Sequence, residues 1–350
     1  MKQSGLNDLA FLCASLHGRR SRLAEKDRLD SLVNFSNRQE LAHALFPGLE
    51  LQTQSGIQLS LLQDFVRELE WCIGYLNEAG RALVEALLMR FSVENLKVFV
   101  RCILNQAPLQ ELERFTLALP QDAGPDPANL SRLHTLTELI EGLKGLPRLW
   151  LSDAVLLCGP WDRPFFFEAA LDSFFFRELL HRMNRLAKGE QEILKPLVFQ
   201  EIDSFHLMLF MRGHYHYGLP LDSLIRFHVP NTAIPRHQFA AMNTEPTPLM
   251  AAKRVLGRAL DELPQIPQES PAEVVVPEIE RLAWKRFLRL ANAAFRHSHM
   301  GLGAVVGYLA LRRVEVANLI TISEGVRVDL PALRTRTRLI QRGAPETEHV

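Results

Sequence analysis

Residues 199–212 read FQEIDSFHLMLFMR, and this stretch decides the fold class that we expect for the chain. Positions 205–211 are apolar except for His206, a pattern that indicates a helix buried on all sides. Glu201 and Asp203 precede the apolar run, which suits the start of a helix because carboxylates interact favourably with the positive end of its dipole. On a helix these two carboxylates point about 200° apart, so they cannot act together on one substrate.

Two further segments share this layout. They are residues 90–112, RFSVENLKVFVRCILNQAPLQEL, and residues 313–333, RVEVANLITISEGVRVDLPAL. In all three segments a polar residue precedes a leucine, and we name these polar residues the anchors: Asn95, His206 and Asn318. A proline follows each anchor by about 13 residues, at Pro108, Pro220 and Pro331, and proline is suited to the first turn of the next helix.

The anchors lie 111 and 112 residues apart. Two nearly equal intervals predict three similar helical units, with bounds 1–119, 120–232 and 233–343, followed by a frayed tail at 344–350. Residues 120–127, PQDAGPDP, predict a break between the first two units. Residues 264–277, PQIPQESPAEVVVP, hold four prolines and predict an exposed loop, because proline cannot continue a helix.

Apolar residues recur at steps of three and four in residues 61–73, 166–180 and 284–295. Such steps are typical of amphipathic helices. Strand patterns flanked by Asn-Gly or Asp-Gly turns do not occur, and the β-branched run at 274–276 is too short to found a sheet. The predicted fold class is therefore all-α.

Composition excludes several classes of protein. Hydrophobic residues make up 47% of 350 residues, enough for a large core. Lys plus Arg and Asp plus Glu both number 40, which argues against a dedicated nucleic-acid binder. The four cysteines are far apart, as expected for reduced thiols in a cytoplasmic setting. The longest uncharged apolar stretch, residues 300–311, is shorter than the roughly 20 residues that span a membrane.

Motifs for catalysis or cofactor binding are weak. His214 and His216 form an HxH pair that could bind zinc or nickel, but no third ligand is suitably spaced, and a polar loop is the preferred interpretation. His297 and His299 repeat the pattern. No GxxxxGK[ST] phosphate loop and no GxSxG elbow occurs. We therefore expect no metal, no cofactor and no catalytic residue.

Four segments together resemble a family of rotary V/A-type ATPase subunits, those lettered C in the archaeal-type enzymes and d in the eukaryotic ones. They are residues 15–45 (SLHGRRSRLAEKDRLDSLVNFSNRQELAHAL), 165–180 (FFFEAALDSFFFRELL), 199–212 and 301–319 (GLGAVVGYLALRRVEVANL). The match is to an Arg-rich opening helix, an aromatic helix with Leu-Asp, a Glu-Ile-Asp helix, and Gly-Tyr-Leu followed by Glu-Val-x-Asn-Leu. His206 stands where that family usually has Asn, and an early tyrosine of the family is missing here.

The resemblance implies three helical domains around a pseudo-threefold axis, forming a funnel. It also implies a non-catalytic member of the central stalk on the cytoplasmic side of a membrane, which transmits torque between the central-shaft subunits and the proteolipid ring. Two alternatives stay open. A generic helical-repeat scaffold is disfavoured by the long period, because common helical repeats run to roughly 34–47 residues. A small-molecule enzyme would be favoured by a tightly bound metal or cofactor.

A basic stretch offers a candidate docking surface. Residues 281–313 contain seven Lys or Arg and no acidic residue, which predicts uncompensated positive potential. Arg281, Lys285, Arg289 and Arg296 fall at steps of four, four and seven, so they share one face of a helix. We name these four residues the basic stripe. A solvated face is the plain alternative, and docking onto acidic groups of the shaft or anionic headgroups near the ring is the functional one.

Overall fold

The computed structural model describes residues 4–48, 54–106, 112, 115–120, 134–158, 164–256 and 266–341. Within these residues every regular element is helical and none is a strand, which confirms the predicted all-α class. The predicted tail at 344–350 and most of the predicted break at 120–127 lie outside the described residues.

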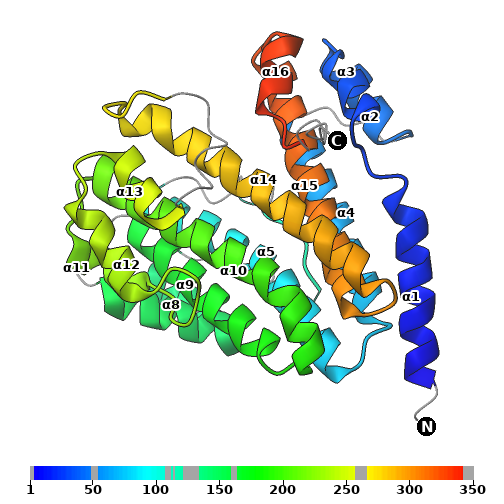
Figure 1. The fold of residues 1–350 in the computed structure, drawn as a ribbon, viewed down its shortest axis with the longest axis horizontal. Helices are drawn as coiled ribbons and strands as arrows, with labels where there is room; N and C mark the ends of the chain where they lie inside the picture. The colour runs from blue at the N-terminus through cyan, green and yellow to red at the C-terminus, as the bar shows by residue number, and fades with distance from the viewer. Residues whose placement is uncertain are drawn as a thin grey trace, which may run out of the picture.

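Six long helices form three consecutive pairs and carry most of the core (Figure 1). The pairs are α4 (Gln54–Ile73) with α5 (Glu78–Leu104), α9 (Pro164–Met183) with α10 (Lys188–Phe210), and α14 (Ala272–Ser298) with α15 (Leu302–Arg327). The second helix of each pair packs against the first helix of the next, so that α5 contacts α9, α10 contacts α14, and α15 contacts α4. These contacts join the three pairs in a closed cycle.

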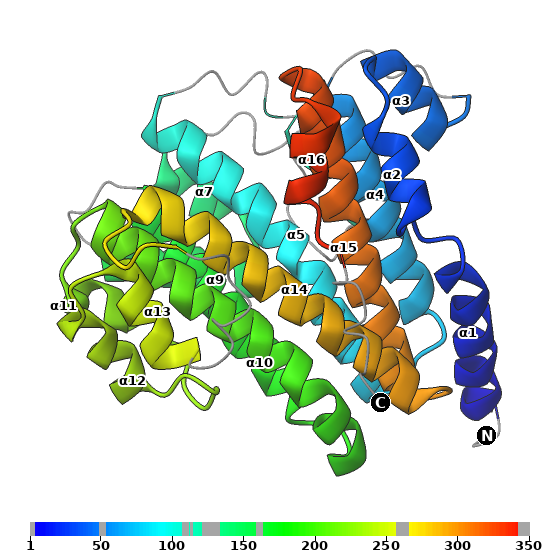
Figure 2. The same ribbon diagram turned by 45° about the horizontal axis from the view of Figure 1, so that its top comes forward.

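Shorter helices surround this cycle. They are α1 (Ser4–Arg20), α2 (Asp27–Val33), α3 (Arg38–Leu45), α7 (Leu136–Gly142), α8 (Gly145–Cys158), α11 (Leu221–Leu224), α12 (Arg236–Ala241), α13 (Pro248–Leu256) and α16 (Ala332–Arg338). Two 3₁₀ turns, η3 (Ile225–Phe227) and η4 (Met242–Thr244), link α11 to α13. Helix α1 lies at one end of the molecule and α11 to α13 lie at the other (Figure 2).

The predicted loop at 264–277 is wrong for its second half. Helix α14 begins at Ala272, directly after Pro271, and holds Pro277 in its interior. Proline removes one helical hydrogen bond there, but Val275 and Ile279 are completely buried, with 0% exposure. Burial of this apolar face outweighs the local preference of proline for a break.

Asn95 and Asn318 hold distant backbone in the same way. The side-chain nitrogen of Asn95 donates to the carbonyl of Leu117 at 2.9 Å, and its oxygen accepts from the Leu117 amide at 2.9 Å. Asn318 makes the same two bonds to Ile340, at 2.9 and 2.7 Å. In both cases the held residue lies 22 positions after the anchor. Both asparagines are buried, so these bonds satisfy groups that water cannot reach.

His206 makes one related bond, but the residue that it holds lies one position further from its anchor than Leu117 and Ile340 lie from theirs. Its Nε2 accepts from the amide of Val229, 23 positions downstream, at 2.9 Å. The extra position coincides with a π-helical turn, η2 (Met211–His216), which continues α10. A π-helical turn accommodates one additional residue within a helix. The expectation that His214 and His216 lie in a loop after the helix is therefore wrong, because this turn extends the helix through both residues.

The three helices that carry the anchors are each followed by a residue in the left-handed region of the backbone map. These residues are Gln106 (φ 51°), Gly218 (φ 63°) and Asp329 (φ 50°), and each stands two positions before Pro108, Pro220 or Pro331. A left-handed residue commonly ends a helix, and glycine is the residue that adopts it without steric cost. Pro220 and Pro331 directly precede α11 and α16 as their N-cap residues, one position before the first turn in which we expected them. Pro108 lies outside the described residues.

Glycine lets α14 and α15 approach closely. A Cβ atom on Gly307 would lie 2.5 Å from the backbone nitrogen of Phe295 and 2.9 Å from the carbonyl oxygen of Ala291. Only a residue without a side chain fits at position 307, so the two helix backbones can pack directly against each other here.

Candidate functional site

Three charged residues meet where α5, α10 and α15 converge. Arg90 and Arg313 both donate to the same oxygen, Oε2, of Glu201. Each member of this triad stands five positions before an anchor. Comparison of the three similar segments at that position could have found the triad from the sequence, although its residues are not of one type.

Burial and the neighbouring charges shift the pKa of Glu201 in opposite directions. Burial raises the pKa of Glu201, but the guanidinium groups of Arg313 and Arg90 outweigh it and hold that pKa below its usual value. Arg90 also lies over the ring of Phe175 at 4.8 Å, and Arg313 lies over the ring of Trp284 at 5.1 Å. The aromatic faces stabilise the second positive charge that one carboxylate leaves unbalanced.

Asp203 points away from the triad. Its Oδ1 accepts from the amide of Ile234 at 3.1 Å, and burial raises its pKa to about 6. The two carboxylates therefore point in different directions, as expected, and bond different partners.

A second set of ion pairs joins α5 to α9. The Nζ of Lys97 lies 2.6 Å from Asp172 and 3.0 Å from Glu94, and Arg101 donates to Glu168 at 2.9 Å. Burial lowers the pKa of Lys97, but Asp172 and Glu94 outweigh it and raise that pKa. The lysine therefore remains charged inside the contact between the two helices.

Two adjoining hollows lie beside these charged groups. One, of about 480 Å³, is lined mainly by α9 and the end of α10, and the other, of about 270 Å³, by α5, α9, α10 and α14. Asp172, Phe205 and Met208 line both, so the hollows adjoin one another. Trp284 and the whole triad line the smaller hollow. The combined surface mixes aromatic and aliphatic side chains with paired charges, which is typical of a protein-binding surface.

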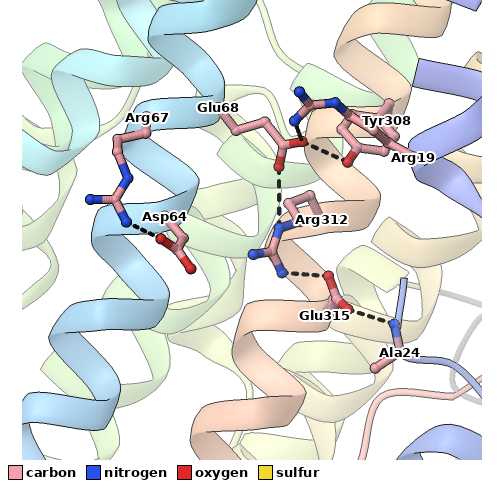
Figure 3. A network of polar contacts seen from close by, with 8 residues as sticks. All are labelled: Arg19, Ala24, Asp64, Arg67, Glu68, Tyr308, Arg312 and Glu315. Carbon is pink, nitrogen blue, oxygen red and sulfur yellow. Dashed lines mark hydrogen bonds and ion pairs between the residues drawn. The ribbon is translucent and has the colours of Figure 1, made fainter. Parts of the chain in front are cut away.

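A polar network fastens α1 to the cycle of long helices (Figure 3). Glu68 on α4 accepts from Arg19 at 2.9 Å, from the Tyr308 hydroxyl at 2.8 Å and from Arg312 at 3.2 Å. Arg312 also bonds Glu315, which accepts from the backbone amide of Ala24. The network thus joins α1, the segment after it, α4 and α15 around one buried carboxylate.

The basic stripe lies along α14, as predicted. Arg281 is paired with Glu278, its Nη2 lying 2.6 Å from the carboxylate. Arg289 and Arg296 are exposed, whereas Lys285 is partly buried.

The expectation of uncompensated charge over all of residues 281–313 is wrong. Arg312 is neutralised by Glu68 and Glu315, and Arg313 shares Glu201 with another arginine. Helix packing brings Glu68 from α4 and Glu201 from α10, which the local sequence cannot reveal.

The HxH pair does not form a metal site with its neighbours. Nδ1 of His214 lies 3.3 Å from the carbonyl oxygen of Leu219, and Nδ1 of His216 lies 3.7 Å from Glu273. Across the described residues, no group of three or more His, Cys, Asp or Glu side chains could hold a metal ion. Within the same residues, no helix is both long enough and apolar enough to cross a membrane.

Comparison with known proteins identifies the family. Curated proteins give no significant match. The profile of a family described as the ATP synthase (C/AC39) subunit matches residues 12–338, a span that contains the six long helices, the anchors and the triad. The family resemblance expected from the sequence is confirmed, and this chain belongs to the ATP synthase (C/AC39) subunit family.

Proposed function

We propose that this chain is a non-catalytic central-stalk component of a rotary V/A-type ATPase and couples the rotating shaft to the proteolipid ring. The observation that carries the proposal is the family match over residues 12–338. In this role the chain transmits torque between ATP hydrolysis or synthesis and the transport of H⁺ or Na⁺, both of which occur in other subunits. It would lie at the cytoplasmic side of the membrane and contact it only peripherally.

The proposed architecture is three units, at 1–119, 120–232 and 233–343, related by a pseudo-threefold axis. Three observations support it: the closed cycle of helix pairs, the meeting of three equivalent positions in the triad, and the similar bonds of Asn95 and Asn318. A threefold arrangement brings equivalent positions together at its axis, which accounts for ion pairs between residues 111 and 112 positions apart.

The two adjoining hollows are the proposed binding site of the shaft. Phe205, Met208 and Trp284 supply apolar surface, and ion pairs between α5 and α9 brace the wall beside them. Close packing and paired charges make a stiff wall, which a torque-transmitting element needs because a compliant one would absorb the rotation.

The proposal is tested by reconstitution. Purified chain is mixed with the central-shaft subunits and, separately, with the proteolipid ring, and binding is measured by sedimentation. Met208→Glu places a charge in both hollows and should weaken shaft binding at least tenfold. The matched control is Leu156→Glu on α8, a side chain that is 81% exposed and lines neither hollow; it should leave shaft binding unchanged. Wild-type chain that binds neither the shaft nor the ring contradicts the proposal.

A further inference from the structure

His206 is an anchor that can change its charge, unlike Asn95 and Asn318. It is completely buried, with 0% exposure, and its Nε2 lies 2.9 Å from the amide nitrogen of Val229. An amide N–H can only donate, so Nε2 must accept, and the neutral ring carries its proton on Nδ1. Nδ1 has no hydrogen-bond partner among the described residues.

A second histidine lies against the first. The rings of His206 and His228 are stacked, with centroids 4.3 Å apart and planes 9° apart. Nε2 of His228 lies 2.9 Å from the carbonyl oxygen of Ile234, so it donates. His206 thus holds the start of the segment 228–234 against α10, Asp203 holds its end through the Ile234 amide, and the His228 bond closes the segment on itself. Phe239 lies edge-on to both imidazole rings.

Charged groups reach this pair from four helices. They are Asp203 on α10, Arg177 on α9, Arg286 on α14 and Arg236 on α12. Oδ1 of Asp203 is 4.0 Å from Nδ1 of His206, too far for a hydrogen bond. Arg177 donates to the carbonyl of His228 at 3.2 Å. The surroundings therefore add positive charge next to the stacked imidazoles, with one carboxylate nearby.

We infer that His206 makes the segment 228–234 an acid-sensitive latch. Protonation of Nε2 removes the lone pair that accepts from the Val229 amide. Two N–H donors, that of the imidazolium and that of Val229, then face each other and repel, so the segment moves away from α10. The segments held by Asn95 and Asn318 stay closed at the same pH, because an amide does not titrate in this range. This inference is independent of the proposed role in a rotary ATPase.

The direction of the pH effect follows from the pKa shifts. Burial and then His228 lower the pKa of His206, and burial lowers the pKa of His228. An opened segment therefore binds more protons than the closed one once pH falls below the ordinary histidine pKa of about 6.5. One proton taken up on opening raises the opening constant about tenfold for each pH unit below that value.

The titration of Asp203 has the opposite effect on the opening of the segment as pH falls. Burial raises its pKa to about 6, so the closed segment holds the extra proton and gains stability as pH falls through that value. Removing this titration should make the acid opening steeper, whereas removing the titration of His206 should make it shallower and leave only the smaller contribution of His228. The two residues can therefore be told apart.

The test is hydrogen exchange of the full chain between pH 7.5 and 5, followed by mass spectrometry and corrected for the pH dependence of intrinsic exchange. Peptides that contain Val229 should lose protection as pH falls below about 6.5, by up to about tenfold per pH unit until Asp203 begins to oppose the change near pH 6. Peptides that contain Leu117 and Ile340, held by Asn95 and Asn318, are controls within the same molecule and should stay nearly constant. Parallel behaviour of all three peptides in the wild-type chain overturns the inference, and this comparison requires no variant.

Two variants sharpen the test. His206→Asn installs the side chain of the other two anchors, and the acid-induced loss of protection at Val229 should then shrink to the smaller contribution of His228. Asp203→Asn retains an oxygen that can accept from Ile234, and the loss of protection at Val229 should become steeper below about pH 6. An acid response that persists unchanged in His206→Asn assigns the titration to another group and overturns the inference.

Discussion

Glu201 and Arg313 form an ion pair although 112 positions of the chain separate them. The pair is partly shielded from water, with side-chain exposures of 10% and 26%. Arg90 bonds the same carboxylate oxygen, so Glu201 links α5, α10 and α15. The free energy of unfolding should therefore respond strongly to this one carboxylate.

Replacing Glu201 by Gln should destabilise the chain by about 3 kcal/mol, because it leaves two partly buried guanidinium groups without their counter-charge. The measurement is urea unfolding followed by circular dichroism. Asp64→Asn is the control, since it breaks the more exposed pair with Arg67 and should cost at most about 0.5 kcal/mol. Equal losses in both variants contradict the role given to the triad.

The residues with positive φ that follow α15 and the π-helical turn after α10 give a second prediction. Asp329→Gly should stabilise the chain by up to about 1 kcal/mol, because glycine adopts a positive φ without the steric cost borne by other residues. Gly218→Ala, at the equivalent position of the second repeat, should destabilise it by about 1 kcal/mol. The measurement is the thermal unfolding midpoint of each variant, which should rise for Asp329→Gly and fall for Gly218→Ala. Midpoints that move in the same direction would contradict the assigned positive φ.

The contact between α14 and α15 gives a third prediction. Gly307→Ala should destabilise the chain by about 2 kcal/mol, because the added methyl group meets backbone atoms that cannot move aside. Gly189→Ala is the matched control in α10, where the new Cβ has nothing within 4 Å, and it should stabilise the helix by up to about 1 kcal/mol. Urea midpoints should move in opposite directions.

Much of the fold was predictable because its signal is local. The apolar steps at 61–73, 166–180 and 284–295 predicted helices that occur as α4, α9 and α14. The π-helical turn also left a trace, since Pro220 follows its anchor by 14 residues, whereas Pro108 and Pro331 follow theirs by 13. That one-residue difference could have indicated an insertion within the helix.

The candidate site was less predictable because its contacts join distant parts of the chain. Glu68 meets Tyr308 and Arg312 across 240 and 244 positions, and no sequence pattern pairs them. The helix around Pro277 was missed for a related reason, because the burial that stabilises it depends on neighbours brought by the fold.

The basic stripe remains a proposed docking surface. Its four residues lie along one helix, α14, and two of them, Arg289 and Arg296, are exposed. Arg281 is held by Glu278. The proposal rests on the run of like charge along this face. Attraction between such a face and an acidic partner acts within about 8 Å at physiological salt, so docking should weaken as salt rises.

Reversal of charge at Lys285, Arg289 and Arg296 to Glu tests this surface in the assembled complex. If the stripe binds acidic groups of the shaft, the triple variant should associate with the shaft subunits at least tenfold more slowly, with a smaller dependence on salt. If it faces anionic headgroups around the ring, the same loss should occur with ring-containing vesicles instead. Arg22→Glu, which reverses an exposed charge between α1 and α2, controls for net charge and should alter neither rate. If association is unchanged with both partners, at low and high salt, the docking proposal is wrong and the stripe is an ordinary solvated helix face.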